Sequence, residues 1–122
     1  MTGAKPCSTP LSTSKLNHDS PLCANASEYR SLVGALQYLT WTRPDLSFAV
    51  NLFCQYMHTP KLSHFQAVKR ILRYLKGSLD IGLWFSKCST PPTLTAFSDA
   101  DWAGCALDRR STGGYCVYLG NL

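Results

Sequence analysis

The helical part of the fold is decided first by residues 62–77, which run LSHFQAVKRILRYLKG. Apolar residues recur in this stretch at helical spacing, and they predict a buried stripe made of Val68, Ile71, Leu72 and Leu75. Ser63 followed by Gln66 matches a capping box, which predicts where the helix begins. Gly77 is expected to supply its C-terminal cap.

Two further helices are predicted upstream of this stretch. The first begins behind Ser27 as its N-cap and ends near Thr42 or Arg43, before a proline. Pro44 and Asp45 then suit the first turn of the second helix. The first helix carries Tyr29, Leu32, Val33, Leu36 and Leu39 at helical spacing, and the second carries Leu46, Ala49, Val50, Phe53 and Met57.

The flanks of the helical region differ from it in pattern. Residues 1–27 are rich in Ser, Thr and Pro, so we expect an extended arm or linker there. Beyond Gly77 short aromatic or β-branched runs predict strands at Ile81–Phe85, Leu94–Asp99 and Tyr115–Leu119. The predicted fold class is therefore α+β, with an arm at 1–27, about three helices within 28–77 and an incomplete sheet within 78–122.

Composition favours one small domain with an anionic partner. The chain has 122 residues, 45% of them hydrophobic, and a formal net charge of +5. It lacks both the run of roughly 20 apolar residues of a membrane helix and the apolar block of a secretory signal. We therefore expect an intracellular protein without a membrane partner, whereas the choice between nucleus, cytoplasm and organelle stays open.

The cysteines give no metal or redox motif. No C-x-x-C pair and no Cys/His cluster with zinc spacing is present, which argues against a zinc knuckle. An even number of cysteines is compatible with disulfides, but in an intracellular chain reduced thiols that pack in the fold are expected. The six residues are Cys7, Cys23, Cys54, Cys88, Cys105 and Cys116.

A row of cations marks the helix of residues 62–77. Lys69, Arg70, Arg73 and Lys76 lie away from the apolar stripe, and the stretch holds no acidic residue. Such a row can neutralise phosphates and so bind nucleic acid without reading its sequence. The alternative is a solvated helix face whose positive residues suit the C-terminal end of the helix dipole.

Two aspartates follow a strand-like run at Phe97–Gly104. Carboxylates at a strand end can hold Mg²⁺, and a pair of such ions can cleave a phosphodiester. Such a site needs about three or four carboxylates, whereas an isolated D-x-D is more often a turn. Asp99 and Asp101 are thus candidate ligands that spacing alone does not make a catalytic site.

The remaining motifs carry less chemistry. His18, His58 and His64 have no partner at the spacing of a metal site or a catalytic triad. Because His58 and His64 lie next to predicted helix caps, solvent exposure or local hydrogen bonding is expected of these two. The run Ser111–Gly114 lacks the lysine and the spacing of a phosphate-binding loop. Nucleotide hydrolysis is therefore not supported.

Several motifs, in this order, resemble the Pol polyprotein of copia-type LTR retrotransposons, especially those of plants. The likeness covers nearly the whole chain. It rests on GAKPC at 3–7, YRSLVGALQYL at 29–39, TRPD at 42–45, AVKRILRYLKG at 67–77, SDADWAGC at 98–105 and DRRSTGGY at 108–115.

The resemblance implies a place in the parent polyprotein. Residues 28–77 would form a thumb- or connection-like region that links reverse transcriptase to ribonuclease H. Residues 78–122 would begin a ribonuclease H-like mixed sheet, of which the chain holds only the first strands. Asp99 would match the first metal-binding, catalytic aspartate, and Asp101 is the weaker candidate.

The chain differs from the family at the motifs that carry the catalytic carboxylates. The family's Ser-Thr-Glu-Ala-Glu-Tyr motif, which carries the second catalytic carboxylate, has no counterpart here, and neither do the paired aspartates of the polymerase. Mg²⁺ is implied for the intact parent enzyme, and tight binding to this chain alone is not expected. The resemblance thus predicts a catalytically inactive Pol fragment, with the rest of the polyprotein and an RNA–DNA hybrid or duplex as partners. The alternative is a basic nucleic-acid-binding module without catalysis.

Overall fold

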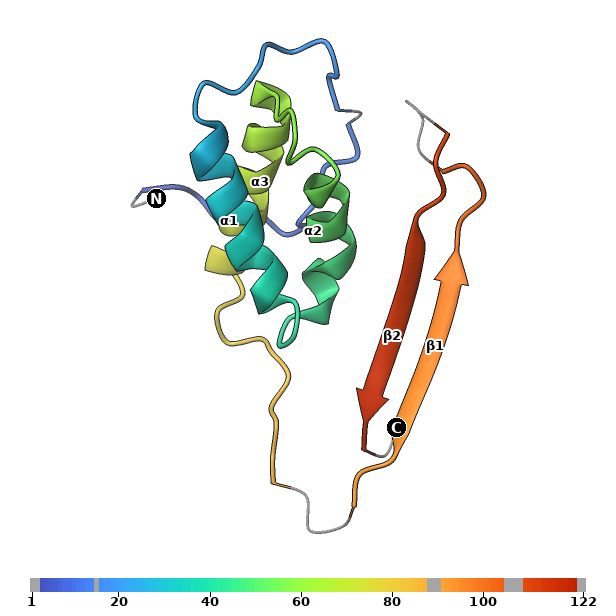
Figure 1. The fold of residues 1–122 in the computed structure, drawn as a ribbon. Coiled ribbons are helices and arrows are strands. Elements are labelled where there is room, and N and C mark those ends of the chain that lie inside the picture. The colour runs from blue at the N-terminus through green and yellow to red at the C-terminus, as the bar shows by residue number, and fades with distance from the viewer. Residues whose placement is uncertain (1–2, 15, 88–90, 105–108, 121–122) are drawn as a thin grey trace. The chain divides into compact units, whose positions relative to one another are not determined.

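A computed structural model describes residues 3–14, 16–87, 91–104 and 109–120 of the chain. The chain divides into two compact units, Met1–Trp84 and Phe85–Leu122. The first unit holds helices α1 (Ala26–Leu39), α2 (Ser47–Cys54) and α3 (Leu62–Lys76), and the second holds strands β1 (Leu94–Ala100) and β2 (Gly113–Leu119) (Figure 1). Three helices with a two-stranded antiparallel sheet confirm the α+β class.

The first helix begins earlier than the sequence predicts. Asn25, not Ser27, is the N-cap, and its side-chain oxygen accepts a hydrogen bond from the backbone N–H of Glu28 at 3.4 Å. The helix ends at Leu39, and turns carry the chain on to Thr42. Its buried residues are Tyr29, Val33 and Leu36, which belong to the predicted stripe.

The second predicted helix is divided into two parts. Residues Pro44–Leu46 form one 3₁₀ turn with proline in the first position, and α2 follows directly. Four members of the predicted stripe are confirmed, because Leu46, Ala49, Val50 and Phe53 are all at most 1% exposed. The fifth, Met57, lies beyond the end of α2 at Cys54 and is only partly buried, so the helix is shorter than predicted. The Tyr29 hydroxyl donates a hydrogen bond of 2.8 Å to the Phe53 carbonyl, which ties α1 to α2 inside the core.

The third helix confirms the stripe but not the predicted cap. Val68 and Ile71 are fully buried, whereas Leu72 and Leu75 are only partly buried against the core. Lys61 is the N-cap, and its backbone N–H donates to Nδ1 of His64 at 3.2 Å. The capping box predicted at Ser63 is therefore wrong, since Ser63 lies inside the helix and its hydroxyl donates to the carbonyl of Asn17.

The segment before α1 packs against the helices. Cys23 N–H donates to the Pro60 carbonyl and Leu62 N–H to the Pro21 carbonyl, both at 2.9 Å, so this segment pairs with the start of α3. Leu11, Leu16 and Cys23 pack against the buried core. Residues 3–14 and 16–25 thus form no helix, as predicted, but they cover the helical unit rather than leave it.

A C-terminal cap at Gly77 is confirmed, for a reason that the sequence does not reveal. The φ angle of Gly77 is −88°, which any residue can adopt. A Cβ atom at this position would lie 3.0 Å from Cβ of Pro6, however, so the glycine allows the arm to approach the end of α3 closely.

The strand predicted at Ile81–Phe85 is wrong. These residues form no regular secondary structure, although Leu83 N–H donates to the Thr42 carbonyl at 2.8 Å. One such bond holds the segment beside the turn after α1, but a strand needs a continuous ladder with a partner. Its apolar side chains stay largely exposed, with Trp84 at 91%.

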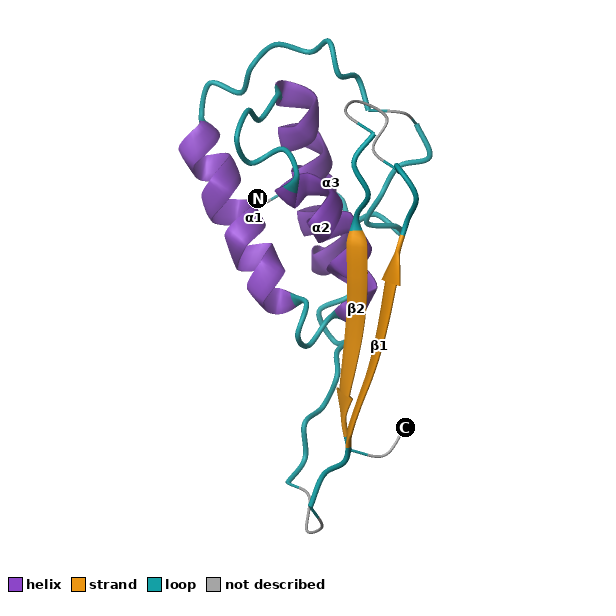
Figure 2. Cartoon of the chain, turned by 45° about the vertical axis from the view of Figure 1, so that its right-hand side comes forward, coloured by secondary structure: helices purple, strands orange, loops and turns teal. Residues whose placement is uncertain are grey.

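The second unit is an antiparallel hairpin. Figure 2 shows β1 and β2 side by side, running in opposite directions. Register pairs Leu94 with Leu119, Phe97 with Cys116 and Asp99 with Gly114, so Phe97, Asp99 and Cys116 share one face. The rings of Phe97 and Tyr118 meet edge to face on that side. Both predicted strands are confirmed, and each is longer by one or two residues.

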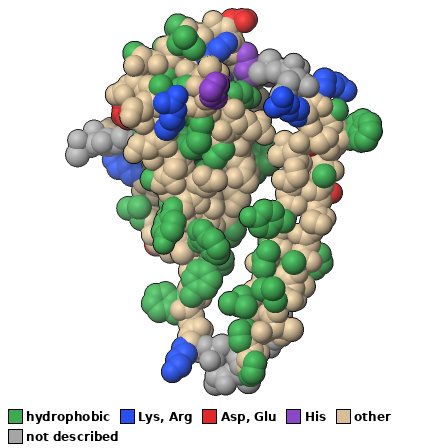
Figure 3. Space-filling model, viewed as in Figure 1, with side chains coloured by type: hydrophobic (Ala, Val, Ile, Leu, Met, Phe, Trp, Pro, Cys, Tyr) green, Lys and Arg blue, Asp and Glu red, His purple; other side chains and the backbone are tan. Residues whose placement is uncertain are grey.

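Apolar side chains cover the hairpin on both faces. All residues of β1 and β2 except Thr95 are exposed, and Figure 3 shows hydrophobic side chains along its length. A two-stranded ribbon of this kind is marginally stable by itself and gains stability from further strands or a covering helix.

Candidate functional site

The four cations of α3 lie on its second half, beside the N-terminal arm. Nη2 of Arg70 donates to Oγ1 of Thr9 at 2.8 Å, and Nζ of Lys76 donates to the Ala4 carbonyl at 3.0 Å. The arm also bonds to the helix backbone, since Cys7 N–H donates to the Arg73 carbonyl at 3.4 Å. The arm therefore borders the basic face and partly covers Arg70 and Arg73, which are half-buried.

The basic face keeps its positive charge. The arm atoms that accept bonds from Arg70 and Lys76 are a hydroxyl and a carbonyl, and neither is charged. Lys69 is exposed, with Nζ 4.3 Å from the centre of the Phe65 ring. Among the described residues no carboxylate lies within ion-pair distance of these four cations. Uncompensated cations on one helix can contact successive phosphates.

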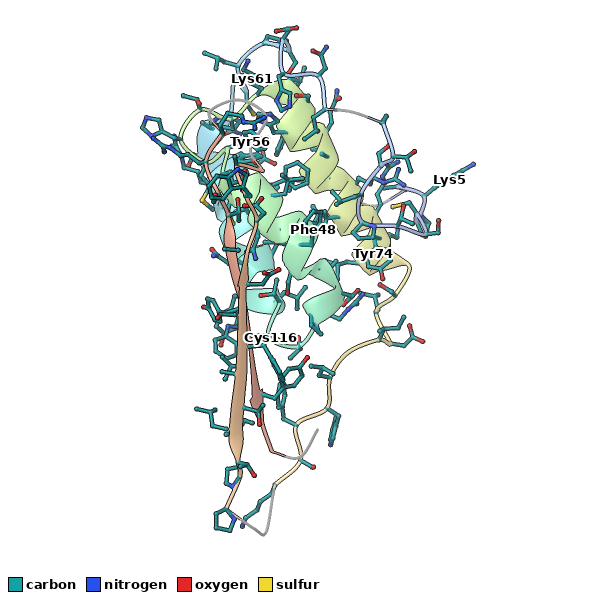
Figure 4. All side chains as sticks on the ribbon, turned by 90° about the vertical axis from the view of Figure 1, so that its right-hand side faces the viewer. Lys5, Phe48, Tyr56, Lys61, Tyr74 and Cys116 are labelled. Carbon is teal, nitrogen blue, oxygen red and sulfur yellow. The ribbon has the colours of Figure 1, made fainter. Side chains whose placement is uncertain are left out.

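Lys5 adds a cation that the sequence analysis did not connect with this face. It is exposed, and Figure 4 shows its side chain pointing outward from the arm beside α3. No signal in the sequence could have placed it there, because the hydrogen bonds that hold residues 4–9 of the arm against α3 join residues 61 or more positions apart.

A buried arginine organises the turn between α1 and α2. Arg43 is 4% exposed, forms an ion pair of 2.9 Å with Asp45, and donates to the carbonyl and hydroxyl oxygens of Ser78 at 2.7 and 2.9 Å. The Tyr74 hydroxyl donates to Asp45 at 3.0 Å. Hydrogen bonding from Arg43 holds the pKa of Asp45 below its usual range. The network joins the TRPD run to the end of α3, so its role is structural.

His64 is buried, which corrects the expectation of exposure. It is 2% exposed, and its ring stacks on Tyr56 with centroids 3.9 Å apart. The expected local hydrogen bond is present, because Nδ1 accepts from Lys61 N–H. The proton of the neutral ring is therefore on Nε2, which is buried without a partner among the described residues. Burial, and then the charges of His18 and Lys61, lower the pKa of His64.

Acidification is expected to weaken the helical unit through His64. The unfolded chain takes up a proton below the ordinary pKa of 6.5, whereas the folded chain resists it, so stability is complete above that pH and falls below it. Lowering the pH from about 7.5 to about 5.5 should therefore lower the free energy of unfolding through this residue. Urea titrations at both pH values measure the loss.

Two variants isolate that effect. His64→Gln should remove this part of the pH dependence, because glutamine does not titrate. His58→Gln, at an exposed position, should retain it. Equal pH dependence in wild type and His64→Gln would contradict the assignment.

Asp99 lies near the end of β1 in the second unit. It is exposed and borders a shallow hollow of about 300 Å³, which Phe97, Cys116 and Gly114 also line. Asp101 has a different role, because its side chain accepts a hydrogen bond from the backbone N–H of Thr112, which directly precedes β2. Asp101 thus links the residues that adjoin the two strands.

The described residues do not form a metal site. No group of three or more His, Cys, Asp or Glu side chains that could hold an ion occurs among them. Asp99 and the α3 cations belong to different compact units. The described thiols Cys7, Cys23, Cys54 and Cys116 are free, and Cys88 and Cys105 lie outside the described residues. No helix in the described part of the chain has the length and apolarity to cross a bilayer.

Comparison with known proteins shows close relatives in plants. The chain is 53% identical to the retrovirus-related Pol polyprotein from transposon RE2 of Arabidopsis thaliana, over 99% of this chain and 8% of that protein. It is 51% identical to an uncharacterized mitochondrial protein of the same plant, over 98% of this chain and 50% of that protein. A second uncharacterized mitochondrial protein of this plant is 47% identical, over 65% of this chain and 70% of that protein.

The chain therefore spans half or less of the first two relatives. No family profile matches the chain, and no solved structure matches it.

Proposed function

Because the chain is homologous over nearly its whole length to a segment of retrovirus-related Pol polyproteins from plant transposons, we propose that it connects the polymerase and ribonuclease H parts of a copia-type polyprotein. The helical unit would be the thumb- or connection-like region after the polymerase. The hairpin would be the first two strands of ribonuclease H. The observation that carries the proposal is 53% identity to the RE2 polyprotein across 99% of the chain.

The antiparallel hairpin supports the second half of this proposal. Strand β1 delivers Asp99 close to its end, where a metal-binding carboxylate of ribonuclease H is required, and β2 returns beside it. Further strands would cover the exposed apolar faces of this ribbon.

Mg²⁺ would be the cofactor of the parent enzyme. The described residues of this chain do not suit it by themselves, because among them Asp99 belongs to no group of three or more His, Cys, Asp or Glu side chains that could hold an ion. The remaining ligands would come from elsewhere in the polyprotein. We therefore propose no catalysis by this chain alone.

Cleavage of RNA in an RNA–DNA hybrid tests the assignment of Asp99. The purified chain should leave the hybrid intact in Mg²⁺. A chimera should cleave it when the chain is extended by the residues that follow the matching segment in the RE2 polyprotein. Asp99→Asn in the chimera should lower the rate by about two orders of magnitude, because a metal ligand is lost.

Asp101→Asn is the matched control. It should keep most of the activity, because asparagine can still accept the hydrogen bond from Thr112 N–H. Loss of cleavage with Asp101→Asn but not with Asp99→Asn would show that Asp101, and not Asp99, is the metal ligand. Cleavage by the chain alone, abolished by Asp99→Asn, would contradict catalytic inactivity.

A second proposed function is nucleic-acid binding through Lys69, Arg70, Arg73 and Lys76 without catalysis. It is favoured by a helix face with four cations and no ion-pair partner among the described acids. The double variant Lys69→Gln/Lys76→Gln should weaken binding to duplex DNA and reduce the slope of log affinity against log salt by about 2. Fluorescence anisotropy over a range of salt concentrations measures the slope.

A charge-matched control uses Lys87→Gln/Arg109→Gln, which removes two exposed cations from the other unit. This control should leave the salt slope nearly unchanged. Equal slopes for the two double variants would show that only the net charge matters, and they would count against a localised interface.

A further inference from the structure

A cleft lies beneath the N-terminal arm, between the arm, α2 and α3. Its volume is about 480 Å³, which falls within the range of sites for small molecules. The arm supplies Leu16, α2 supplies Leu52 and Phe53, and α3 supplies Gln66, Arg70 and Arg73. Three separate segments of the first unit therefore converge on one concave surface.

The lining of this cleft combines cations with an apolar wall. Arg70 and Arg73 lie one turn apart on α3, and no described acid pairs with either of them. Leu16, Leu52 and Phe53 provide the apolar part. Two guanidinium groups favour a phosphate, which they can bind through paired N–H donors, and the apolar wall favours an organic group with apolar surface.

Some N–H groups of the two arginines have no hydrogen-bond acceptor among the described residues. Arg70 donates from Nη2 to Thr9, but its Nε is buried without a partner among the described residues. The side chain of Arg73 makes no hydrogen bond within the described part of the chain. The guanidinium group of Arg73 therefore keeps its donors for a ligand, whereas Nε of Arg70 is enclosed by the protein.

From this arrangement we propose that the cleft binds a phosphate monoester with a partly apolar organic body, of the size of a mononucleotide. The phosphate lies against Arg73 and Arg70, and the organic body lies against Leu52 and Leu16. This site differs from a duplex interface, because Lys69 does not line the cleft although it belongs to the same row of cations. The inference does not depend on the proposed place in a polyprotein.

Binding of deoxyadenosine monophosphate to the full chain tests the proposal, with deoxyadenosine as the uncharged comparison. The monophosphate should bind about tenfold more tightly, because only it bonds to the guanidinium groups. Arg73→Gln should weaken its binding about tenfold, whereas Lys87→Gln, at an exposed position of the other unit, should change it less than about twofold. Isothermal titration calorimetry at physiological salt measures all four affinities.

A second variant guards against misfolding of Arg73→Gln. Gln66 is exposed on α3, so Gln66→Glu is expected to fold normally while it places a carboxylate at the cleft. It should weaken binding of the monophosphate and leave binding of deoxyadenosine unchanged. Equal affinity for the two probes, absence of binding to the wild type, or equal losses in Arg73→Gln and Lys87→Gln would each overturn the proposal.

The phosphate can belong to a free mononucleotide or to the end of a strand. A single-stranded oligonucleotide with a 5′-phosphate and the same strand with a 5′-hydroxyl distinguish the two sources. Tighter binding of the phosphorylated strand, lost in Arg73→Gln, assigns the cleft to a strand end. Equal binding of the two strands, together with Arg73-dependent binding of the monophosphate, assigns it to the free mononucleotide.

Discussion

Replacing Phe53 by alanine is expected to lower the free energy of unfolding of the helical unit by about 3–5 kcal/mol. The side chain is 1% exposed and belongs to the buried core. Its removal loses the transfer free energy of the ring and leaves a cavity that rigid helices only partly fill. Urea unfolding of the full chain gives the free energy of unfolding of each variant, with the helical signal followed by far-ultraviolet circular dichroism.

Phe48 provides the matched control on the same helix. It is 75% exposed, so Phe48→Ala should change the free energy of unfolding by no more than about 0.5 kcal/mol. Both variants remove one phenyl ring from α2, and only burial distinguishes them. Similar losses at the two positions would contradict the orientation of α2 in the fold.

Arg43→Met is expected to have the second largest effect, a loss of about 2–4 kcal/mol. Methionine keeps much of the apolar stem but removes the donors to Asp45 and to both oxygens of Ser78. The Ser78 oxygens then lose their charged partner in a buried position, which is more costly than the loss of an exposed ion pair. Urea unfolding monitored by circular dichroism again gives the difference.

Asp45→Asn separates the role of the ion pair from that of the buried bonds. The Asp45 side chain is 36% exposed, and asparagine still accepts a hydrogen bond, so the expected loss is about 1 kcal/mol or less. A larger loss from Asp45→Asn than from Arg43→Met would contradict the view that Ser78 is the more important partner of Arg43.

The helical cores were predictable from sequence because burial imposes a period. Leu46, Val50 and Phe53 repeat at three- and four-residue spacing, and the structure buries all three. The hairpin strands were predictable for the corresponding reason, since the runs ending in Asp99 and Leu119 are rich in residues that favour strands.

Helix boundaries were less predictable, because several residues compete for each cap. Asn25 and Ser27 are both good N-caps, and the structure uses the one whose side chain reaches Glu28 N–H. Ile81–Phe85 has the composition of a strand but pairs through a single bond at Leu83, so composition alone was misleading. Propensity describes a residue, whereas a strand also requires a partner.

The candidate site was predictable only in part. The row at Lys69–Lys76 follows from helical spacing, but the contacts of Arg70 with Thr9 join positions 61 apart. His64 looked like an exposed residue near a cap because nothing nearby indicates that Tyr56 and His18 pack against it. Burial of a polar residue by distant segments leaves no periodic signal in the sequence.

The contacts between the arm and α3 also determine the order of events in folding. Those of residues 4–9 join positions 61 to 72 apart and those of residues 17–20 join positions 43 to 46 apart, whereas each helix forms from neighbours along the chain. Closing so long a loop costs entropy before any contact compensates for it, so the arm should dock after the three helices have assembled. During synthesis the residues that precede the helices are made before them yet take their final place after them. The cleft exists only once they have done so.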